Sequence, residues 1–335
     1  ELTSGLRTAL YQGKGLGGGS LIYGAVAMKP QDFIFDEWSR LSGVASINGE
    51  SLEPHYKHIA EVMSVTKQAI TQENKSNSIV RQMAAALGQS DGLETVSRYT
   101  QGCAGAGLCN LGCGFNLKGT MANSFIPLGL ETGNLTILTE CEAHGFEGTR
   151  STTDSYRANG LKVTIKDFSG GVVVRRGTIK ARHFILAAGA FFSSALLLNN
   201  RELPGRERIG RKIYLQPHAQ IFALFDEPIT KRGQIKDGQY IPYHGVPAIY
   251  NFTGFMRTHR FFWLASILFP ANFASFISHL DASQHFELMQ RFHQTMSITL
   301  TLKDDPEKSK IVMRDGQAQL DFKESRADIE NLRQC

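Results

Sequence analysis

The chain has 335 residues, 42% of them hydrophobic and 20% charged, so it can bury a large core in one large or two medium domains. The net charge of +5 includes no basic block, which argues against nucleic acid as a partner. The 33 glycines follow no collagen-like period and are typical of a loop-rich fold that holds a cofactor.

The first predicted element is a glycine-rich loop, GKGLGGGSLIYG, at residues 13–24. Glycine loses more backbone freedom on folding than any other residue, so such a run is favoured where the backbone lies against something that leaves no room for a Cβ. A flexible linker is the alternative, but it would carry Ser/Gly low complexity on both sides. Here the apolar stretch LIYGAVAM overlaps the run and continues it, which indicates an ordered loop.

Helices are predicted next along the chain. An amphipathic segment begins over 31–38, and a helix over 51–65 has Ser51 as its cap and Pro54 in its first turn. A further helix over 76–88 ends at a glycine. Residues 118–133 predict another helix, and residues 134–143 predict a strand.

Three cysteines lie close together in the sequence between these helices, at Cys103, Cys109 and Cys113. They have neither the two-residue spacing nor the fourth ligand that is typical of zinc or iron–sulfur sites, so no metal is predicted. A tight disulfide and packed free thiols are the favoured interpretations.

Residues 161–190 predict a small antiparallel meander, with strands over 161–167, 170–177 and 178–190. The last part, FILAAGA, is fully apolar, which is typical of a strand in the middle of a covered sheet. A helix-like run, FFSSALLLNN, follows at 191–200. A strand, a turn of small residues and a helix can bring the backbone close to a bound nucleotide, although any α/β protein contains similar turns.

The C-terminal third predicts strands over 219–228 and 296–305, a hairpin over 305–322 around Asp315-Gly316, and a helix within 323–335. Between them, residues 261–280 are apolar and aromatic, but Pro270 and Asn272 interrupt the run. A membrane-spanning helix needs about 20 largely apolar residues, so a buried wall is predicted, with membrane-surface contact as the alternative.

Five stretches together resemble the glucose–methanol–choline (GMC) family of flavin oxidoreductases, and within it the cholesterol oxidase and long-chain alcohol oxidase branch. The glycine-rich loop is similar to the family's first signature, and SLEPHYKHIAEVMSV is similar to its Pro-Tyr-Tyr helix. Residues 109–143 resemble the segment that leads from a cysteine-rich loop to the adenine-binding strand. FILAAGAFFSSALLL is similar to the second signature, and RIGRKIYLQPH resembles the Gly-Arg-Asn…His-Pro segment. The stretches occur in the family's order.

The resemblance implies an α/β (α+β) fold, with an incomplete Rossmann-like FAD-binding domain and an antiparallel-sheet substrate domain. Residues 1–32 and 116–200 would form the FAD-binding domain, and residues 33–115 and 201–335 the substrate-binding or cap domain. The family's G-x-G-x-x-G unit and its closing His-x-x-Gly-Thr segment are both absent. We therefore expect the chain to be an internal portion of a longer polypeptide or an incompletely built part of one.

The resemblance also implies which residues would contact FAD. They are the loop residues, then one candidate for adenine and one in the second signature: Gly15, Gly17, Gly18, Gly19, Ser20, Tyr23, Gly24, Ala143 and Gly189. A side chain at Gly17 or Gly18 would collide with the cofactor, and free amides there can face phosphate or flavin oxygens. Tyr23 replaces the usual asparagine, so its phenol could bond elsewhere or its ring could line the substrate cavity. Each residue has an alternative role in packing or in a turn.

The implied activity is oxidation of an alcohol, in which a histidine takes the hydroxyl proton while hydride passes to the flavin. That histidine would lie beyond Cys335, so no catalytic residue is assigned. Oxygen or an electron-acceptor protein would reoxidise the flavin.

The implied substrate is a small apolar alcohol, such as a sterol or a long-chain alcohol, because eight aromatic residues fall in the region that lines the cavity in relatives: Phe252, Phe255, Phe261, Phe262, Trp263, Phe269, Phe273 and Phe276. An ordinary aromatic core is the alternative for this set. Two alternatives to the enzyme remain: a non-catalytic subunit or scaffold that retains the fold, and a membrane-associated dehydrogenase that passes electrons to a partner.

Overall fold

The computed structural model describes residues 12–67, 73–152, 154–168, 172–229, 248–254, 256, 261–266, 270–323 and 325–333. The described chain forms two compact units. The loop unit comprises 12–134 and 217–302, and the meander unit comprises 135–216 and 303–333. These boundaries, after residues 134 and 216, differ from those of the FAD-binding and substrate-binding domains that the sequence predicts. The assignment of those domains to cofactor and substrate stays a prediction.

The N-terminal part of the loop unit contains short elements around a three-stranded antiparallel sheet of order β1-β4-β2. Its helices and strands are η1 (Gly18–Leu21), β1 (Val26–Ala27), α1 (Asp32–Ser42), α2 (Gly49–Val62), β2 (Val65–Lys67), α3 (Lys75–Ala86), η3 (Ser90–Gly92), β3 (Leu93–Thr95), β4 (Ser97–Tyr99), η4 (Cys109–Leu111), η5 (Met121–Asn123) and α4 (Phe125–Glu131). The glycine-rich loop therefore leads directly into the edge strand β1.

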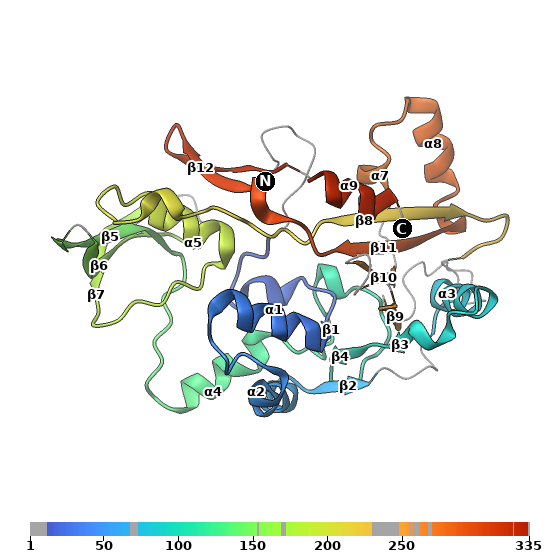
Figure 1. Ribbon diagram of the computed structural model, residues 1–335, viewed down its shortest axis with the longest axis horizontal. Coiled ribbons are helices and arrows are strands. Elements are labelled where there is room, and N and C mark those ends of the chain that lie inside the picture. The colour runs from blue at the N-terminus through green and yellow to red at the C-terminus, as the bar shows by residue number, and fades with distance from the viewer. Residues whose placement is uncertain are drawn as a thin grey trace. The chain divides into compact units, whose positions relative to one another are not determined.

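The second sheet of the loop unit has five antiparallel strands in the order β3-β9-β10-β11-β8. The elements that complete the unit are β8 (His218–Leu224), β9 (Tyr250–Phe252), β10 (Phe261–Ser266), α7 (Pro270–Phe276), α8 (Ala282–Gln290), η7 (Phe292–Gln294) and β11 (Thr295–Leu302). Figure 1 shows β8 and β11 side by side as long strands.

The two faces of this five-stranded sheet differ in polarity. Met296, Ile298 and Leu300 alternate along β11 and pack with Val80 of α3, which forms the apolar core. The intervening residues of β11 are polar: Thr299 accepts a hydrogen bond from the Gln220 amide at 2.7 Å, and Thr301 lies 3.0 Å from His218 Nδ1. The sheet thus packs one face against α3. The other face combines the hydroxyl and amide groups of β11 and β8 with Phe222, whose ring contacts that of Phe273 in α7.

The meander unit contains the three-stranded antiparallel sheet β5-β6-β7 and a separate hairpin. Its elements are β5 (Cys141–Thr152), β6 (Ser155–Lys166), β7 (Val173–Lys180), α5 (Gly189–Leu198), η6 (Arg206–Arg208), η8 (Pro306–Lys308), β12 (Lys310–Arg314), β13 (Gln317–Asp321) and α9 (Arg326–Arg333). Phe191 and Leu198 of α5 pack against Ile311 and Leu320 of the hairpin, and α5 also contacts β5 (Figure 1).

Several sequence predictions are confirmed. The mixed α and β class holds, and the ladders among the described residues are antiparallel. The hairpin turns at Asp315 and Gly316, whose φ angles of +50° and +75° are those of a two-residue turn with two left-handed residues. Helix α3 is followed by Gly88 at φ +64°, as the C-terminal glycine predicts.

Other predictions are wrong in detail. Asn48, rather than Ser51, caps α2: its side chain accepts the N–H of Ser51, which lies inside the helix. Residues 134–138 are irregular, and the strand predicted there begins only at Cys141. The predicted helix over 118–133 is limited to η5 and α4.

The largest correction concerns the apolar segment FILAAGA, which is not assigned as a strand. β7 ends at Lys180, and Ile185 is 92% exposed. The composition of this segment predicts burial, but a strand also needs a neighbour to satisfy its N–H and C=O groups. Within the described residues, no strand pairs with residues 184–190. An apolar run therefore indicates that a segment favours burial, but it does not show that the segment pairs with another strand.

Candidate functional site

The glycine-rich loop forms a tight turn at the start of the loop unit. Gly17 and Gly18 have φ angles of +108° and +55°, in the left-handed region that side chains rarely adopt. The N–H of Gly18 donates to the carbonyl of Gly15 at 3.0 Å, and the N–H of Ser20 donates to that of Gly17 at 3.2 Å. The backbone therefore favours glycine at both positions, most strongly at Gly17, because non-glycine residues of this chain such as Asn116 also adopt a φ near +55°.

Gly19 is glycine for a different reason. Its φ lies outside the left-handed region, and a Cβ placed on it meets no atom of the described residues within 4 Å. The same open space lies above Gly18. By contrast, a Cβ on Gly13 would come within 2.7 Å of the Gly18 carbonyl oxygen, so Gly13 is needed for the loop's internal packing. The loop therefore presents bare backbone at Gly18 and Gly19 to space that the described chain leaves open.

Ser20 holds the loop in place. Its hydroxyl donates to the carbonyl of Gly17 at 2.6 Å and accepts the N–H of Met121 at 2.9 Å. Because its only hydrogen is used within the loop, Ser20 positions the backbone, and it has at most a lone pair left for a ligand.

The side chain of Tyr23 is engaged by neighbours within the loop unit. Its phenol donates to the carbonyl of Gly119 at 2.5 Å, and its ring lies 5.9 Å from that of Tyr99. Burial, followed by the nearby Tyr99, raises the pKa of Tyr23 well above its usual value, so the phenol stays neutral at physiological pH. Of the alternatives for Tyr23, the different hydrogen-bond partner is the one found.

Lys118 lies beneath the loop and is only 2% exposed. Its ammonium donates to three backbone carbonyls: Leu21 at 2.8 Å, Tyr23 at 3.2 Å and Cys109 at 2.6 Å. It also lies 5.1 Å from the centre of the Tyr23 ring, within reach of a cation–π interaction. One buried cation therefore joins the glycine-rich loop to the cysteine-rich segment.

Arg98 of β4 is fully buried and serves the same two segments. Its guanidinium donates to the carbonyl of Gly24 at 2.7 Å and to the sulfur of Cys109 at 3.1 Å. A third bond reaches the carbonyl of Ala248 at 3.3 Å. We call Arg98, Lys118 and their carbonyl partners the cationic hub.

The cysteines around this hub are free thiols. Burial raises the pKa of Cys109, with Arg98 acting against it. At Cys113, burial acts upward too, but the N–H groups of Leu117, Lys118 and Phe115 outweigh it and lower the pKa. Of the two interpretations, packed thiols rather than a disulfide are found. In the described part of the chain, no group of three or more His, Cys, Asp or Glu side chains is arranged to hold a metal.

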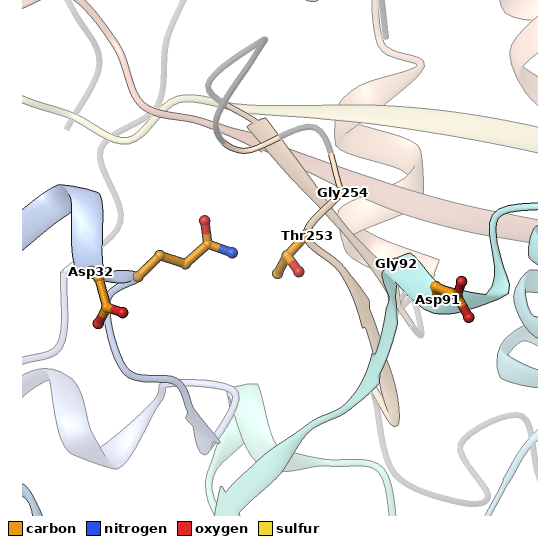
Figure 2. Close-up of a pocket in the computed structure, with 6 residues that line it drawn as sticks. Asp32, Asp91, Gly92, Thr253 and Gly254 are labelled. Atoms are coloured by element: carbon orange, nitrogen blue, oxygen red, sulfur yellow. The ribbon is translucent and has the colours of Figure 1, made fainter.

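A pocket of about 560 Å³ opens elsewhere in the loop unit, between the start of α1 and the edge of the five-stranded sheet. Six residues line it: Gln31, Asp32, Asp91, Gly92, Thr253 and Gly254. Figure 2 shows Asp32 and Asp91 on opposite sides, with Thr253 between them. Gly92 is fixed by packing, since a Cβ there would come within 2.5 Å of the Phe252 ring.

The remaining predicted cofactor residues fall in the meander unit. Ala143 lies on β5, exposed and opposite Val163. Gly189 begins α5 with φ +77°, and a Cβ on it meets no described atom. The seven loop residues lie in the other unit, with Gly24 fixed to the hub and Gly15 packed near Leu21. The two sets are therefore described separately, and their contact with FAD stays a prediction.

The predicted aromatic wall is described only in part. Phe252 and Phe273 are 2% and 1% exposed and belong to the packed interior, whereas Phe276 is 41% exposed. Phe255 and Phe269 lie outside the described residues, and Phe261, Phe262 and Trp263 are placed only as backbone of β10. For Phe252 and Phe273 the alternative of an ordinary aromatic core is the better description. Among the helices of the described segments, none has the length and hydropathy needed to span a bilayer.

Arg98 and Lys118 could not be identified from the sequence. Each is a single basic residue in a polar stretch, SRYTQG and NLKGT, and such residues are mostly solvated. One indication in the sequence that Lys118 could matter for function is that it lies within one of the family-like stretches.

Comparison with known proteins places these residues in a family. A model of the GMC oxidoreductase family matches residues 2–218. A protein of Sinorhizobium fredii called uncharacterized GMC-type oxidoreductase y4nJ is 27% identical over 224 residues, which is 66% of this chain and 41% of that protein. Long-chain-alcohol oxidase FAO4B of Arabidopsis thaliana is 24% identical over 69% of this chain and 30% of its own length.

A solved structure resembles the fold. The crystal structure of pyridoxine 4-oxidase from Mesorbium loti matches with a TM-score of 0.64 at 14% identity, over 96% of this chain and 64% of that one. At this identity the match concerns the fold alone. The chain spans less than half the length of the curated relatives that it matches.

Proposed function

We propose a function for a chain that belongs to the GMC oxidoreductase family: as part of a longer protein, it binds FAD and takes part in oxidising an alcohol by hydride transfer to the flavin. The observation that supports this most is the bare backbone at Gly18 and Gly19, in a loop whose later carbonyls are held by the two buried cations Arg98 and Lys118. A scaffold that binds no cofactor would not need two buried positive charges beside this loop.

The loop residues have separate roles in this proposal. Gly18 and Gly19 let the main chain approach the cofactor, because no Cβ intervenes. Ser20 holds the turn through Gly17 and Met121. When bound, the flavin supplies the hydride acceptor, while the chain's residues orient it and exclude water. The base that removes the alcohol proton is proposed to lie outside this chain.

The substrate class is part of the proposal. The names of two matched relatives, both long-chain-alcohol oxidases, support an apolar primary or secondary alcohol. A polar alcohol is the second candidate, because Gln31, Asp32, Asp91 and Thr253 line the described pocket with hydrogen-bonding groups. Either oxygen or an electron-acceptor protein is proposed to reoxidise the flavin. Contact of the protein with a membrane surface is a separate proposal.

The test uses the full-length protein as purified. Its visible absorption spectrum is recorded, and the flavin is released and identified. The protein is then mixed anaerobically with a long-chain alcohol, a sterol and a polyhydroxylated alcohol. Bleaching of the flavin band by one of these identifies the substrate class, and reoxidation by air separates an oxidase from a dehydrogenase. A colourless protein that binds no added FAD would support the scaffold instead and would overturn the proposal.

A further inference from the structure

The cationic hub is unusual because two basic side chains are buried with no acidic partner among the described residues. Arg98 is 0% exposed and Lys118 is 2% exposed. Within the described residues, neither forms an ion pair with an Asp or Glu; their partners are carbonyl oxygens and the sulfur of Cys109. The Nε of Arg98 is buried with no hydrogen-bond partner in the described structure.

Such an arrangement is costly. Moving a charge out of water is unfavourable unless an opposite charge compensates for it, and carbonyl dipoles do so only in part. A methionine or leucine in place of Lys118 would avoid this cost but would leave the carbonyls of Leu21, Tyr23 and Cys109 without their donor. Beyond satisfying these carbonyls, the uncompensated positive charge favours an anion close to the hub.

The hub also sets the orientation of the loop's peptide groups. In a trans peptide, the carbonyl and the following N–H point in opposite directions. The carbonyl of Tyr23 points to the Lys118 ammonium, so the N–H of Gly24 points away from it. The carbonyl of Gly24 points to Arg98, which turns the N–H of Ala25 away from the guanidinium.

We propose that Lys118 and Arg98 are positioning residues for the flavin, which fix the carbonyls of the glycine-rich loop and supply the positive potential that favours the reduced, anionic cofactor. This inference rests on the proposed function. Lys118 and Arg98 do not touch the cofactor in this account; they act through the peptide groups of residues 21–24 and through their charge. In a low-dielectric interior, that charge acts over a longer range than it would in water.

The test compares variants of Lys118 in the full-length protein. Lys118→Met removes the charge and the donors, Lys118→Gln keeps an amide donor without charge, and Lys118→Arg keeps the charge. Lys57→Met removes an exposed lysine from α2 of the same unit and is the matched control. Two readouts are needed: hydrogen exchange of residues 15–25 in flavin-free protein, and the reduction potential of bound flavin.

We expect Lys118→Met to exchange faster in residues 15–25 and to lower the flavin potential. A tenfold loss of preference for the reduced form corresponds to about 30 mV for a two-electron couple. Lys118→Gln should keep part of the loop protection but show the lowered potential, and Lys118→Arg should approach the wild type in both. Lys57→Met should change neither.

Wild-type exchange and wild-type potential in Lys118→Gln and Lys118→Met would overturn the inference. So would an equal fall in potential in Lys118→Arg, because that variant retains the charge. If Lys118→Met does not fold, the comparison of Lys118→Gln with Lys118→Arg decides the question. Absence of flavin from the wild-type protein would instead contradict the proposed function, while the exchange measurement on flavin-free protein would still test the positioning.

Discussion

The hydroxyl of Ser20 accepts the N–H of Met121 at 2.9 Å, across 101 residues of sequence. The same hydroxyl donates to Gly17 at 2.6 Å, so one side chain ties the glycine-rich loop to the start of η5. The family-like stretch at 13–28 and residues 109–134 of the second stretch are thus parts of one local structure in the loop unit.

Replacing Ser20 with Ala should break this connection. We expect the free energy of unfolding to fall by about 1 kcal/mol, since one donor and one acceptor lose their partner. Flavin affinity should fall as well, because the loop is less ordered. Chemical denaturation and FAD titration measure the two effects. The control is Ser283→Ala, an exposed serine of α8; equal effects in both variants would contradict the role of Ser20.

Gly19→Ala separates the need for open space from the need for a folded loop. The new Cβ meets no described atom and the φ is ordinary, so stability should stay the same or rise by up to about 1 kcal/mol. Flavin affinity should fall roughly tenfold or more, because the methyl group occupies space proposed for the cofactor.

Two further glycines provide controls for this variant. Gly177→Ala on β7 is equally open, so it should show a similar small change in stability and leave flavin affinity unchanged. Gly119→Ala would place a Cβ within 2.5 Å of the Met63 carbonyl oxygen and should lower stability by itself. Unchanged flavin binding in Gly19→Ala would contradict the proposed approach of the backbone to the cofactor.

Tyr23→Phe should show its effect through pH. Because burial raises the pKa of Tyr23 above its usual value near 10, the native state keeps its proton where the unfolded state loses it. The contribution of Tyr23 is therefore complete below about pH 10 and declines as the pH rises above it. Denaturation at several pH values should show wild type about 1 kcal/mol more stable than Tyr23→Phe near neutrality, with the gap closing above pH 10. A gap that widens there would contradict this assignment.

The thiols of the cysteine-rich segment should differ in reactivity. Cys113 has a lowered pKa, since three backbone N–H groups outweigh its burial, while burial raises that of Cys109. At about pH 7.5, iodoacetamide should label Cys113 roughly tenfold faster than Cys109. Mass spectrometry of timed samples measures both rates in one protein. Faster labelling of Cys109, or a disulfide in the purified protein, would be contrary to the structure.

The sequence was informative where local chemistry decides the structure. The Asp315-Gly316 turn and the glycine after α3 were predicted because few residues adopt left-handed backbone. The predicted cap of α2 is three residues too late, since Asn48 and Ser51 are both good caps and only the structure shows which side-chain oxygen accepts a backbone N–H.

The rest depends on partners distant in the sequence. FILAAGA was read as a strand from its composition, but a strand is defined by the neighbour that pairs with it. Nothing in the sequence around Lys118 indicates burial, because the carbonyls of Leu21 and Tyr23 that accept its hydrogen bonds are distant in the sequence. The glycine-rich loop could be predicted; the hub beneath it could not.

The central claim is that residues 15–24 receive the flavin, and hydrogen exchange of the full-length protein with and without FAD tests it most directly. We expect FAD to slow exchange across residues 15–24, with no such change in the β12–β13 hairpin turn at Asp315-Gly316. FAD binding that leaves exchange in residues 15–24 unchanged would contradict it.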